Sequence, residues 1–467
     1  MYDLELLVIG SGPGGQRAAI QAAKLGKRVA VVERRERVGG VSIHTGTVPS
    51  KTLRQAILED ISSRGVDIPD PLNPERHQIA AARFLKDRTA RVIADETALV
   101  RDQFRRNGVG LLIGDAMFID EHRVRISDRL TERTETEVTA EHIVIAVGTT
   151  PARPAGVDFD ERRVIDSDGI LRLEDPVPPT MTVVGGGVIG IEYTSMFAAM
   201  GTRVTLVDAR DGMLPFVDRE IAVALRYLLR KRNVTFQFGE EVVRVERNDE
   251  RVITHLKSGK QIASHTLLYA TGRQGATAGL ALERAGLSAD ERGRISVDDR
   301  FRTEVPHIFA VGDVSGPPGL AATSMEQGRI AALTAFGEPV NTLVDLVPIG
   351  IYAIPEISYV GRNEEELTHD AVPYVVGVAW YRELAKAMIM SERDGLLKIL
   401  VSPEDGALLG VHVIGQQATD LVHIGQALMG RPGALEFLVS AVFNYPTLAE
   451  AYKTAGLDAQ NRMRDLF

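Results

Sequence analysis

Leu6-Leu7-Val8-Ile9-Gly10-Ser11-Gly12-Pro13-Gly14-Gly15 is the stretch that decides the fold, because a short apolar run passes directly into a glycine-rich turn. The run predicts a buried parallel strand over residues 6–10. Residues 16–26 have helical spacing, and residues 28–32 predict a second strand that ends at Glu33. Together these segments predict a strand–helix–strand unit at the start of the chain.

The turn matches the G-x-G-x-x-G pattern of dinucleotide-binding folds. Gly10 would make the tight turn, Gly12 would let the backbone approach a pyrophosphate, and Gly15 would let the helix pack closely, with Gly14 in the same turn. The N-terminus of the following helix offers free N–H groups to phosphates. Glu33 is placed to accept the hydroxyls of an adenosine ribose. The preceding strand, the helix and the acid favour a dinucleotide site over a plain glycine-rich turn.

The same pattern returns at Gly185-Gly186-Gly187-Val188-Ile189-Gly190, after an apolar run over residues 181–184. In both units the acid follows the first glycine by 23 residues, at Glu33 and at Asp208. Asp208 favours NAD because a carboxylate repels the 2′-phosphate of NADP. Arg210, two residues later, could pair with that phosphate or remain solvated. The second site could therefore take NAD, NADP or both.

Two further apolar runs, which end at Gly148 and Gly272, are predicted to be the strands that close the two units. Residues 303–313 predict another buried strand that ends in a Gly-Asp pair, which would place Asp313 near the ribityl chain of a flavin. From about residue 341 the glycine fingerprints cease and an α+β pattern begins. Its predicted strands are 351–360, 374–380, 396–401 and 408–413, and its predicted helices are 417–430 and 434–441.

Composition excludes several classes of protein. The 467 residues are 44% hydrophobic and 25% charged with a net charge of −9, so nucleic-acid binding is not expected. No apolar run approaches a membrane span, and the acidic first residues are unlike a signal peptide, so a cytoplasmic protein is expected. The chain has no cysteine. The histidines, among them His44, His412 and His423, lack ligand spacing, so no metal site is expected.

These motifs, in this order, resemble the FAD-dependent pyridine nucleotide-disulphide oxidoreductase family over nearly the whole chain. The resemblance implies an α/β fold with two Rossmann-like domains and a C-terminal α+β dimerisation domain. It implies that the FAD-binding domain is discontinuous, over 1–150 and 273–340, with the NAD(P)-binding domain inserted at 151–272. Residues 341–467 would form the dimerisation domain, so a homodimer is expected, and a higher homo-oligomer stays open.

The family's redox motif, G-G-x-C-x-x-x-x-C-x-P-S-K, here spans residues 39–51, with Ser42 and Thr47 at both cysteine positions. The family's C-terminal H-P-T-x-x-E motif begins here at Tyr445 and ends at Glu450. A phenol with an ordinary pKa of about 10 is poorly matched to protonating a thiolate. The resemblance therefore implies a flavoenzyme without the disulfide chemistry.

Lys51 and Glu192 are retained at positions whose family equivalents pair beside the flavin and the nicotinamide. A positive charge there would stabilise reduced flavin. Lys51 and Glu192 are the leading catalytic candidates, and Lys51 is also a cofactor-binding candidate. Tyr445 and Glu450 are further catalytic candidates by position.

Within the family, the motifs are most similar to the soluble pyridine nucleotide transhydrogenase group. This similarity implies a Si-specific NAD(P)+ transhydrogenase with tightly held, non-covalent FAD and with NAD and NADP as substrates. One FAD site and one nicotinamide site imply a ping-pong mechanism. Two alternatives stay open: an NAD(P)H reductase of quinones or dyes, and a non-enzymatic flavin redox sensor.

Overall fold

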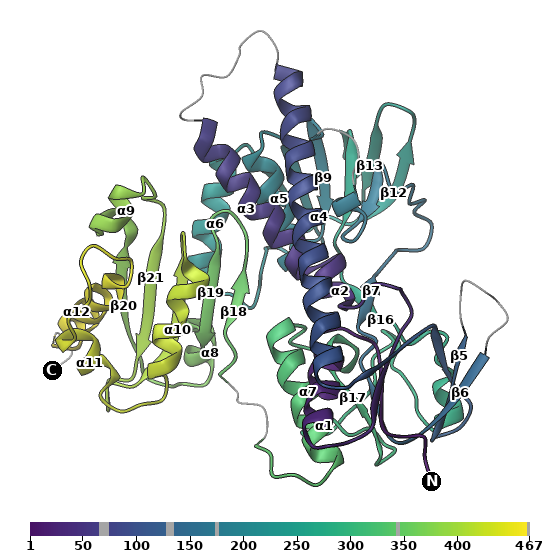
Figure 1. The fold of residues 1–467 in the computed structure, drawn as a ribbon. Helices are drawn as coiled ribbons and strands as arrows, with labels where there is room; N and C mark the ends of the chain where they lie inside the picture. The colour runs from purple at the N-terminus through teal and green to yellow at the C-terminus, as the bar shows by residue number, and fades with distance from the viewer. Residues whose placement is uncertain (65–73, 128–134, 173–176, 342–345, 465–467) are drawn as a thin grey trace.

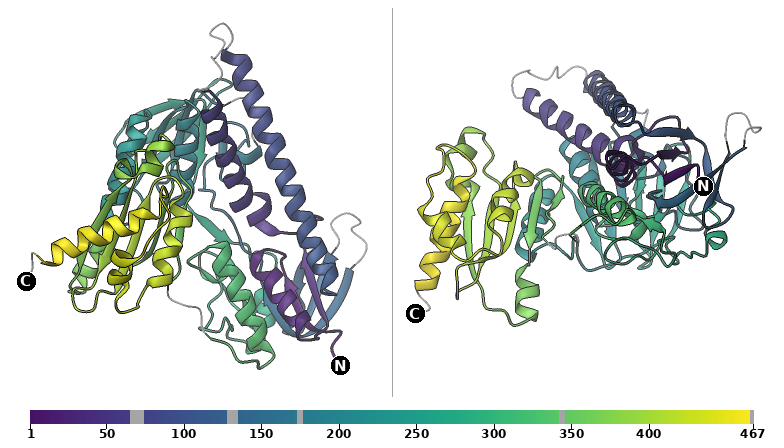
Figure 2. Two further views of the ribbon diagram at one scale, coloured as in Figure 1. Left: turned by 60° about the vertical axis from the view of Figure 1, so that its left-hand side comes forward. Right: turned by 60° about the horizontal axis from the view of Figure 1, so that its bottom comes forward.

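The computed structural model describes residues 1–64, 74–127, 135–172, 177–341 and 346–464. Three units of helices and strands lie side by side, and the C-terminal unit packs against one flank of the other two (Figures 1 and 2). Over the described residues the predicted α/β class with a C-terminal α+β unit is confirmed. No helix in these ranges is long and apolar enough to cross a membrane.

The first unit is built on a sheet with the strand order β3-β2-β1-β6-β5-β4, in which β17 also pairs with β6. β1 pairs in parallel with both β2 and β6, as the predicted strand–helix–strand unit requires. β17 pairs in parallel with β6 although 162 residues lie between Ile145, the last residue of β6, and Ile308, the first residue of β17. The strands are β1 (Leu4–Ile9), β2 (Val29–Glu33), β3 (Gly110–Ile113), β4 (Asp115–Phe118), β5 (Arg123–Ser127), β6 (Glu135–Ile145) and β17 (Ile308–Ala310).

Helices cover this sheet and extend beyond it. α1 packs closely against α7, and α3 and α4 form a long antiparallel pair that projects away from the sheet (Figure 1). The helices are α1 (Pro13–Lys24), α2 (Gly40–His44), α3 (Thr47–Arg64), α4 (Pro74–Arg106) and α7 (Ala321–Ala335), with short 3-10 turns at Leu282–Ala285 and Gly312–Ser315.

The second unit repeats the first on a parallel sheet of order β11-β10-β9-β15-β8. The chain enters it through β7 (Thr149–Pro151) and leaves it through β16 (Arg273–Gly275), and these two strands pair with each other. The predicted boundaries of the NAD(P)-binding domain, at residues 151 and 272, lie in or next to these two strands. The division into domains stays a prediction. The other elements are β8 (Val164–Asp166), β9 (Thr180–Val184), β10 (Arg203–Asp208), β11 (Thr235–Phe238), β12 (Val242–Arg247), β13 (Val252–Leu256), β14 (Gln261–Ser264), β15 (Thr266–Tyr269), α5 (Val188–Ala199), α6 (Arg219–Lys231) and a 3-10 turn at Ile170–Arg172.

The C-terminal unit has an antiparallel sheet of order β18-β19-β22-β21-β20. The single strand predicted over 351–360 is wrong, because the sequence there forms two strands with residues 352–356 between them. The predicted boundary at 341 adjoins residues 342–345, which lie outside the described residues. The elements are β18 (Ile349–Ile351), β19 (Ile357–Gly361), β20 (Val375–Trp380), β21 (Leu396–Val401), β22 (Leu408–Ile414), α8 (Glu364–His369), α9 (Ala385–Ile389), α10 (Ala418–Leu428), α11 (Ala434–Ser440), α12 (Glu450–Arg464) and a 3-10 turn at Tyr381–Glu383.

A fully buried lysine joins the C-terminal unit to the second unit. The Lys398 ammonium on β21 lies 3.0 Å from Asp218 and 3.1 Å from Glu220 of α6, and it also pairs with Glu364 of α8. Burial alone would lower the pKa of Lys398, but hydrogen bonds and charges from Glu364 and Asp218 outweigh burial and raise it. These carboxylates are the one group of three in the described chain that could hold a metal ion, and the lysine charge lies among them.

Candidate active site

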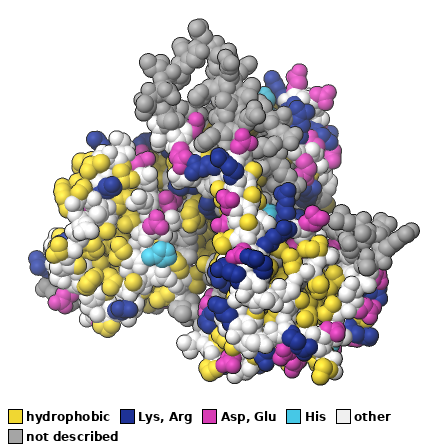
Figure 3. Space-filling view, in the orientation of Figure 1, with side chains coloured by type: hydrophobic (Ala, Val, Ile, Leu, Met, Phe, Trp, Pro, Cys, Tyr) yellow, Lys and Arg dark blue, Asp and Glu magenta, His cyan; other side chains and the backbone are white. Residues whose placement is uncertain are grey.

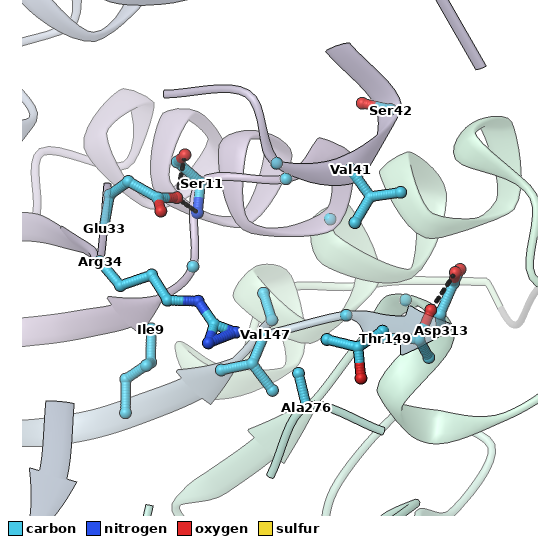
Figure 4. A pocket seen from close by; sticks show the side chains of 18 of the residues that line it. Ile9, Ser11, Glu33, Arg34, Val41, Ser42, Val147, Thr149, Ala276 and Asp313 are labelled. Atoms are coloured by element: carbon cyan, nitrogen blue, oxygen red, sulfur yellow. Dashed lines mark hydrogen bonds between the residues drawn. The ribbon is translucent and has the colours of Figure 1, made fainter. Parts of the chain in front are cut away.

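The first cavity lies where the parallel strands of the first sheet end, which is where open α/β sheets bind ligands. It is lined by most of the predicted cofactor-binding residues of the first unit (Figure 4). The residues that line it include Gly10, Gly12, Gly14, Glu33, Gly148 and Asp313. Segments from both ends of the first unit's sequence therefore meet around one cavity.

The glycines of the first turn have two different reasons for being glycine. Gly10 has φ +108°, and a Cβ there would lie 2.3 Å from the Ala146 carbonyl oxygen. A Cβ on Gly15 would lie 2.0 Å from the Gly10 carbonyl oxygen, which is an impossible contact. At Gly12 no atom of the chain lies within 4 Å of that position. Gly10 and Gly15 are thus required by the chain itself, whereas Gly12 leaves space for something outside the chain.

Glu33 is buried at the end of β2 and holds the first turn. Its carboxylate accepts hydrogen bonds from the Ser11 amide at 3.2 Å and the Ser11 hydroxyl at 2.5 Å (Figure 4). It also accepts the Arg35 amide at 3.1 Å. The Ser11 hydroxyl in turn accepts the Gly39 amide at 2.9 Å. The sequence motif gave no sign of this role for Ser11, because serine occupies a variable position of the pattern.

The cavity has cationic and anionic ends. Arg34, Arg35 and Arg37 line it directly after Glu33, so that end can attract phosphates. At the other end, Asp313 accepts a hydrogen bond at 3.2 Å from the Thr149 hydroxyl (Figure 4).

Arg273 fixes the anionic end of the cavity and was not among the predicted site residues. Its guanidinium donates to the Thr149 hydroxyl at 2.9 Å and to Asp168 at 2.9 Å. Its position directly after Gly272, and the acidic Asp166-Ser167-Asp168 stretch, were signals that could have indicated it.

The second cavity lies at the matching edge of the second sheet. A Cβ on Gly190 would lie 1.8 Å from the Gly185 carbonyl oxygen, whereas one on Gly187 would meet no atom within 4 Å. The second turn therefore repeats the geometry of the first, with a packing glycine and an open glycine. The predicted residues that line this cavity are Gly185, Gly187, Asp208, Arg210 and Gly272.

Asp208 and Arg210, which both line this cavity, form an ion pair with each other. The guanidinium donates to both carboxylate oxygens, at 2.9 and 2.7 Å, and the Gly186 amide also donates to Asp208 at 2.5 Å. Burial alone would raise the pKa of Asp208, but the hydrogen bonds from Arg210 and Gly186 outweigh it and hold the pKa below its usual range. Asp208 is thus a charged carboxylate at neutral pH.

The structure places Lys51 of α3 and Glu192 of α5 in direct contact. The Lys51 ammonium donates to both oxygens of the Glu192 carboxylate, at 2.9 and 2.7 Å. Glu192 is buried, and it accepts a third hydrogen bond from the Tyr352 amide at 2.8 Å. Lys51 lies one turn of α3 after Thr47, which lines the first cavity. The pair joins the first unit to the second beside that cavity.

The positions of the family's cysteines are occupied by hydroxyl side chains. Ser42 and Thr47 both line the first cavity, and the Ser42 hydroxyl donates to the Gly39 carbonyl at 3.1 Å. Tyr445 and Glu450 are elsewhere: neither is among the residues lining the two cavities within this chain. Tyr445 is 74% exposed, and Glu450 accepts the Thr447 amide at 3.2 Å.

A pair of glycine variants separates folding from ligand binding. Gly15→Ala is expected to destabilise the protein by at least about 1–3 kcal/mol, because the new methyl overlaps the Gly10 carbonyl. Gly12→Ala is expected to melt at the temperature of the unchanged ligand-free protein but to lose dinucleotide affinity. Differential scanning fluorimetry of the ligand-free proteins and calorimetric titration with dinucleotide measure the two effects. Unchanged affinity in Gly12→Ala would show that no phosphate approaches this turn.

Comparisons with known proteins agree with this geometry. The model of the pyridine nucleotide-disulphide oxidoreductase family matches residues 4–328, and the model of that family's dimerisation domain matches residues 347–456. A soluble pyridine nucleotide transhydrogenase of Mycobacterium tuberculosis (strain ATCC 25177 / H37Ra) is 55% identical over 466 residues, which cover 100% of this chain and 99% of that protein. The protein of the same name from Pseudomonas putida is 43% identical over 471 residues, with 99% of each chain covered.

Solved structures match the fold over nearly the whole chain. The Cu(II) complex of the HOCl-induced flavoprotein disulfide reductase RclA from Escherichia coli has a TM-score of 0.88 at 28% identity, covering 98% of this chain and 99% of that one. LpdA from Mycobacterium tuberculosis has a TM-score of 0.88 at 25% identity, covering 99% of both chains. The two glycine turns, the sheets that carry them and these matches show that the chain belongs to the pyridine nucleotide-disulphide oxidoreductase family.

Proposed function

We propose that this protein is an FAD-dependent NAD(P)+ transhydrogenase, with NADPH and NAD+ as its substrates. One combination of features carries the proposal. The chain has two cavities with dinucleotide-binding turns and a Lys51–Glu192 pair, but hydroxyl side chains stand at both positions of the family's cysteines. The chain can therefore bind two dinucleotides but has no thiol to reduce a disulfide. The full-length identity to proteins named soluble pyridine nucleotide transhydrogenase supports the same function.

The first cavity has the residues to hold FAD. The space left open at Gly12 and the α1 N-terminus suit a diphosphate. Glu33 is placed to accept adenosine ribose hydroxyls in addition to its bonds with Ser11, and Asp313 would accept hydroxyls of the ribityl chain. When bound, FAD supplies the ability to take a hydride from one nicotinamide and return it to another.

Lys51 and Glu192 would provide fixed electrostatics for this transfer. Lys51 holds a positive charge beside the first cavity, and the buried Glu192 carboxylate fixes the position of that charge through two hydrogen bonds. A preorganised charge needs no rearrangement when negative charge develops nearby, so it lowers the barrier more than a mobile group would.

One cavity remains for nicotinamide nucleotides, because the first is committed to FAD. In the second cavity, the open position at Gly187 and the N-terminus of α5 would receive the pyrophosphate. Asp208 suits the ribose hydroxyls of NAD, and Arg210 suits the 2′-phosphate of NADP. NADPH and NAD+ would therefore occupy the same residues in turn.

The C-terminal unit suits a homodimer. Its surface carries a gathering of hydrophobic side chains, on the left of Figure 3. Exposed large hydrophobic residues of this unit, among the residues described, are Met388, Ile389, Phe437, Val442, Tyr445 and Leu457. Contact of this unit with a second chain would bury apolar area, and such a contact could include the exposed Tyr445. The homodimer, the role of Tyr445 and Glu450 and a cytoplasmic location stay predictions.

The function is tested by mixing the FAD-loaded protein with NADPH and thio-NAD+. Formation of reduced thio-NAD, followed by absorbance, is expected without any thiol or disulfide. Lys51→Met should lower kcat about 100-fold, the scale for removing one preorganised group. Lys27→Met is the matched control, because Lys27 pairs with Glu5 at 3.4 Å and neither residue lines either cavity. NADPH oxidation with quinone but not with thio-NAD+ would assign an acceptor reductase, and no turnover with either would favour a redox sensor.

Arg210→Ala tests how the second cavity recognises NADP. The variant is expected to raise the KM for NADPH about tenfold or more, because a charge-assisted hydrogen bond is worth about 1.5–3 kcal/mol. The KM for NADH should stay the same or fall, because Asp208 is freed from its partner. Arg244→Ala is the comparison, since Arg244 lines the same cavity. An equal change for both nucleotides, or an NADPH-selective change in Arg244→Ala alone, would contradict the assignment to Arg210.

A further inference from the structure

The segment Tyr352–Glu356, between β18 and β19, is attached to helices of both other units. The Tyr352 amide donates to Glu192 at 2.8 Å, and the Ile354 amide donates to the Ser195 hydroxyl at 3.0 Å, both on α5. On α3, the Arg54 guanidinium donates to the Ala353 carbonyl at 2.9 Å. We call these five residues the junction segment. It places the C-terminal unit against the two helices that carry Lys51 and Glu192.

The far end of the junction segment is anchored by a second buried carboxylate. Glu356 accepts hydrogen bonds from Arg54 at 3.3 Å, from the Gln417 amide at 3.1 Å and from the Thr419 amide at 3.2 Å. The Thr419 hydroxyl donates to the same carboxylate at 2.5 Å. A buried carboxylate with this many donors holds the backbone around it in one arrangement. The junction segment is therefore a rigid support.

The side chain of Tyr352 reaches the ammonium of Lys51. The Lys51 nitrogen lies 4.7 Å from the centre of the Tyr352 ring, within the range of a cation–π interaction. Burial raises the pKa of the Tyr352 phenol, so the ring faces the lysine as a neutral π surface. The ammonium is thus held by the Glu192 carboxylate and the Tyr352 ring together, while the Tyr352 amide holds Glu192.

We propose that Tyr352 is a positioning residue for the hydride-transfer site, which fixes the Lys51 charge through its ring and the Glu192 carboxylate through its amide. The role rests on the proposed function for its consequence in catalysis. The geometry itself is independent of that function: Lys51 of the first unit, Glu192 of the second and Tyr352 of the C-terminal unit contact one another.

The ring is tested by replacing Tyr352 with phenylalanine and with mono-, di- and trifluorinated phenylalanines. Fluorine weakens the π face with almost no change of shape, so the variants should fold alike and retain FAD. Stepwise lower kcat is expected across the series, reaching a fall of about 2- to 30-fold when the cation–π interaction is lost. The midpoint potential of the bound flavin should become more negative in the same order, because the positive charge near it is held less firmly.

The matched control is Tyr227 on α6, whose ring lies 4.8 Å from the Lys231 ammonium and which is 60% exposed. The same fluorinated residues at 227 should change neither kcat nor the potential. Tyr352→Leu, which removes the ring, is expected to show the full loss. A flat fluorinated series at 352 would overturn the proposal, as would a loss in Tyr352→Phe as large as that in Tyr352→Leu. The potential requires no nicotinamide acceptor, so it tests Tyr352 even if the unchanged protein shows no transhydrogenation and the proposed function fails.

Discussion

The buried carboxylate of Glu192 is the constraint on which the arrangement of the site depends. A carboxylate removed from water is costly unless charged and hydrogen-bonding partners surround it. Its partners here come from residues 141 and 160 positions away along the chain, Lys51 and the Tyr352 amide. The first unit, the second unit and the C-terminal unit must therefore come together at this point. The same contacts that stabilise the charge also place the lysine beside the first cavity.

In both glycine turns, one glycine is needed for packing and another leaves space at the cavity. In each, the third glycine of the fingerprint allows the helix to pack on the turn, and the second leaves open space at the cavity. The two turns differ in the partner that binds the acidic residue after the second strand. Glu33 is engaged with the turn through Ser11, whereas Asp208 is paired with Arg210. The first acid thus stabilises the turn of its own unit, while Arg210, the partner of the second acid, is a cation for which a phosphate could compete.

Much of this could be predicted from the sequence because it is local. The strand–helix–strand units depend on apolar runs, glycines and one acid within about thirty residues, and the structure confirms their elements to within three residues. The ion pair between Arg210 and Asp208 depends on side-chain rotamers, which the spacing of residues in a sequence cannot specify. Tyr352 was missed because no motif marks it. The sequence over 351–360 was predicted to be one strand, and the break at residues 352–356 is the segment that reaches Glu192 and Lys51.

The single nicotinamide site is tested most directly by initial-rate kinetics with NADPH and NAD+ varied together. If Gly187, Asp208 and Arg210 receive both nucleotides in turn, the double-reciprocal lines are parallel, and each nucleotide in excess inhibits competitively against the other. Lines that intersect would contradict this account, because they require both nucleotides to be bound at once and therefore a second nicotinamide site on the protein.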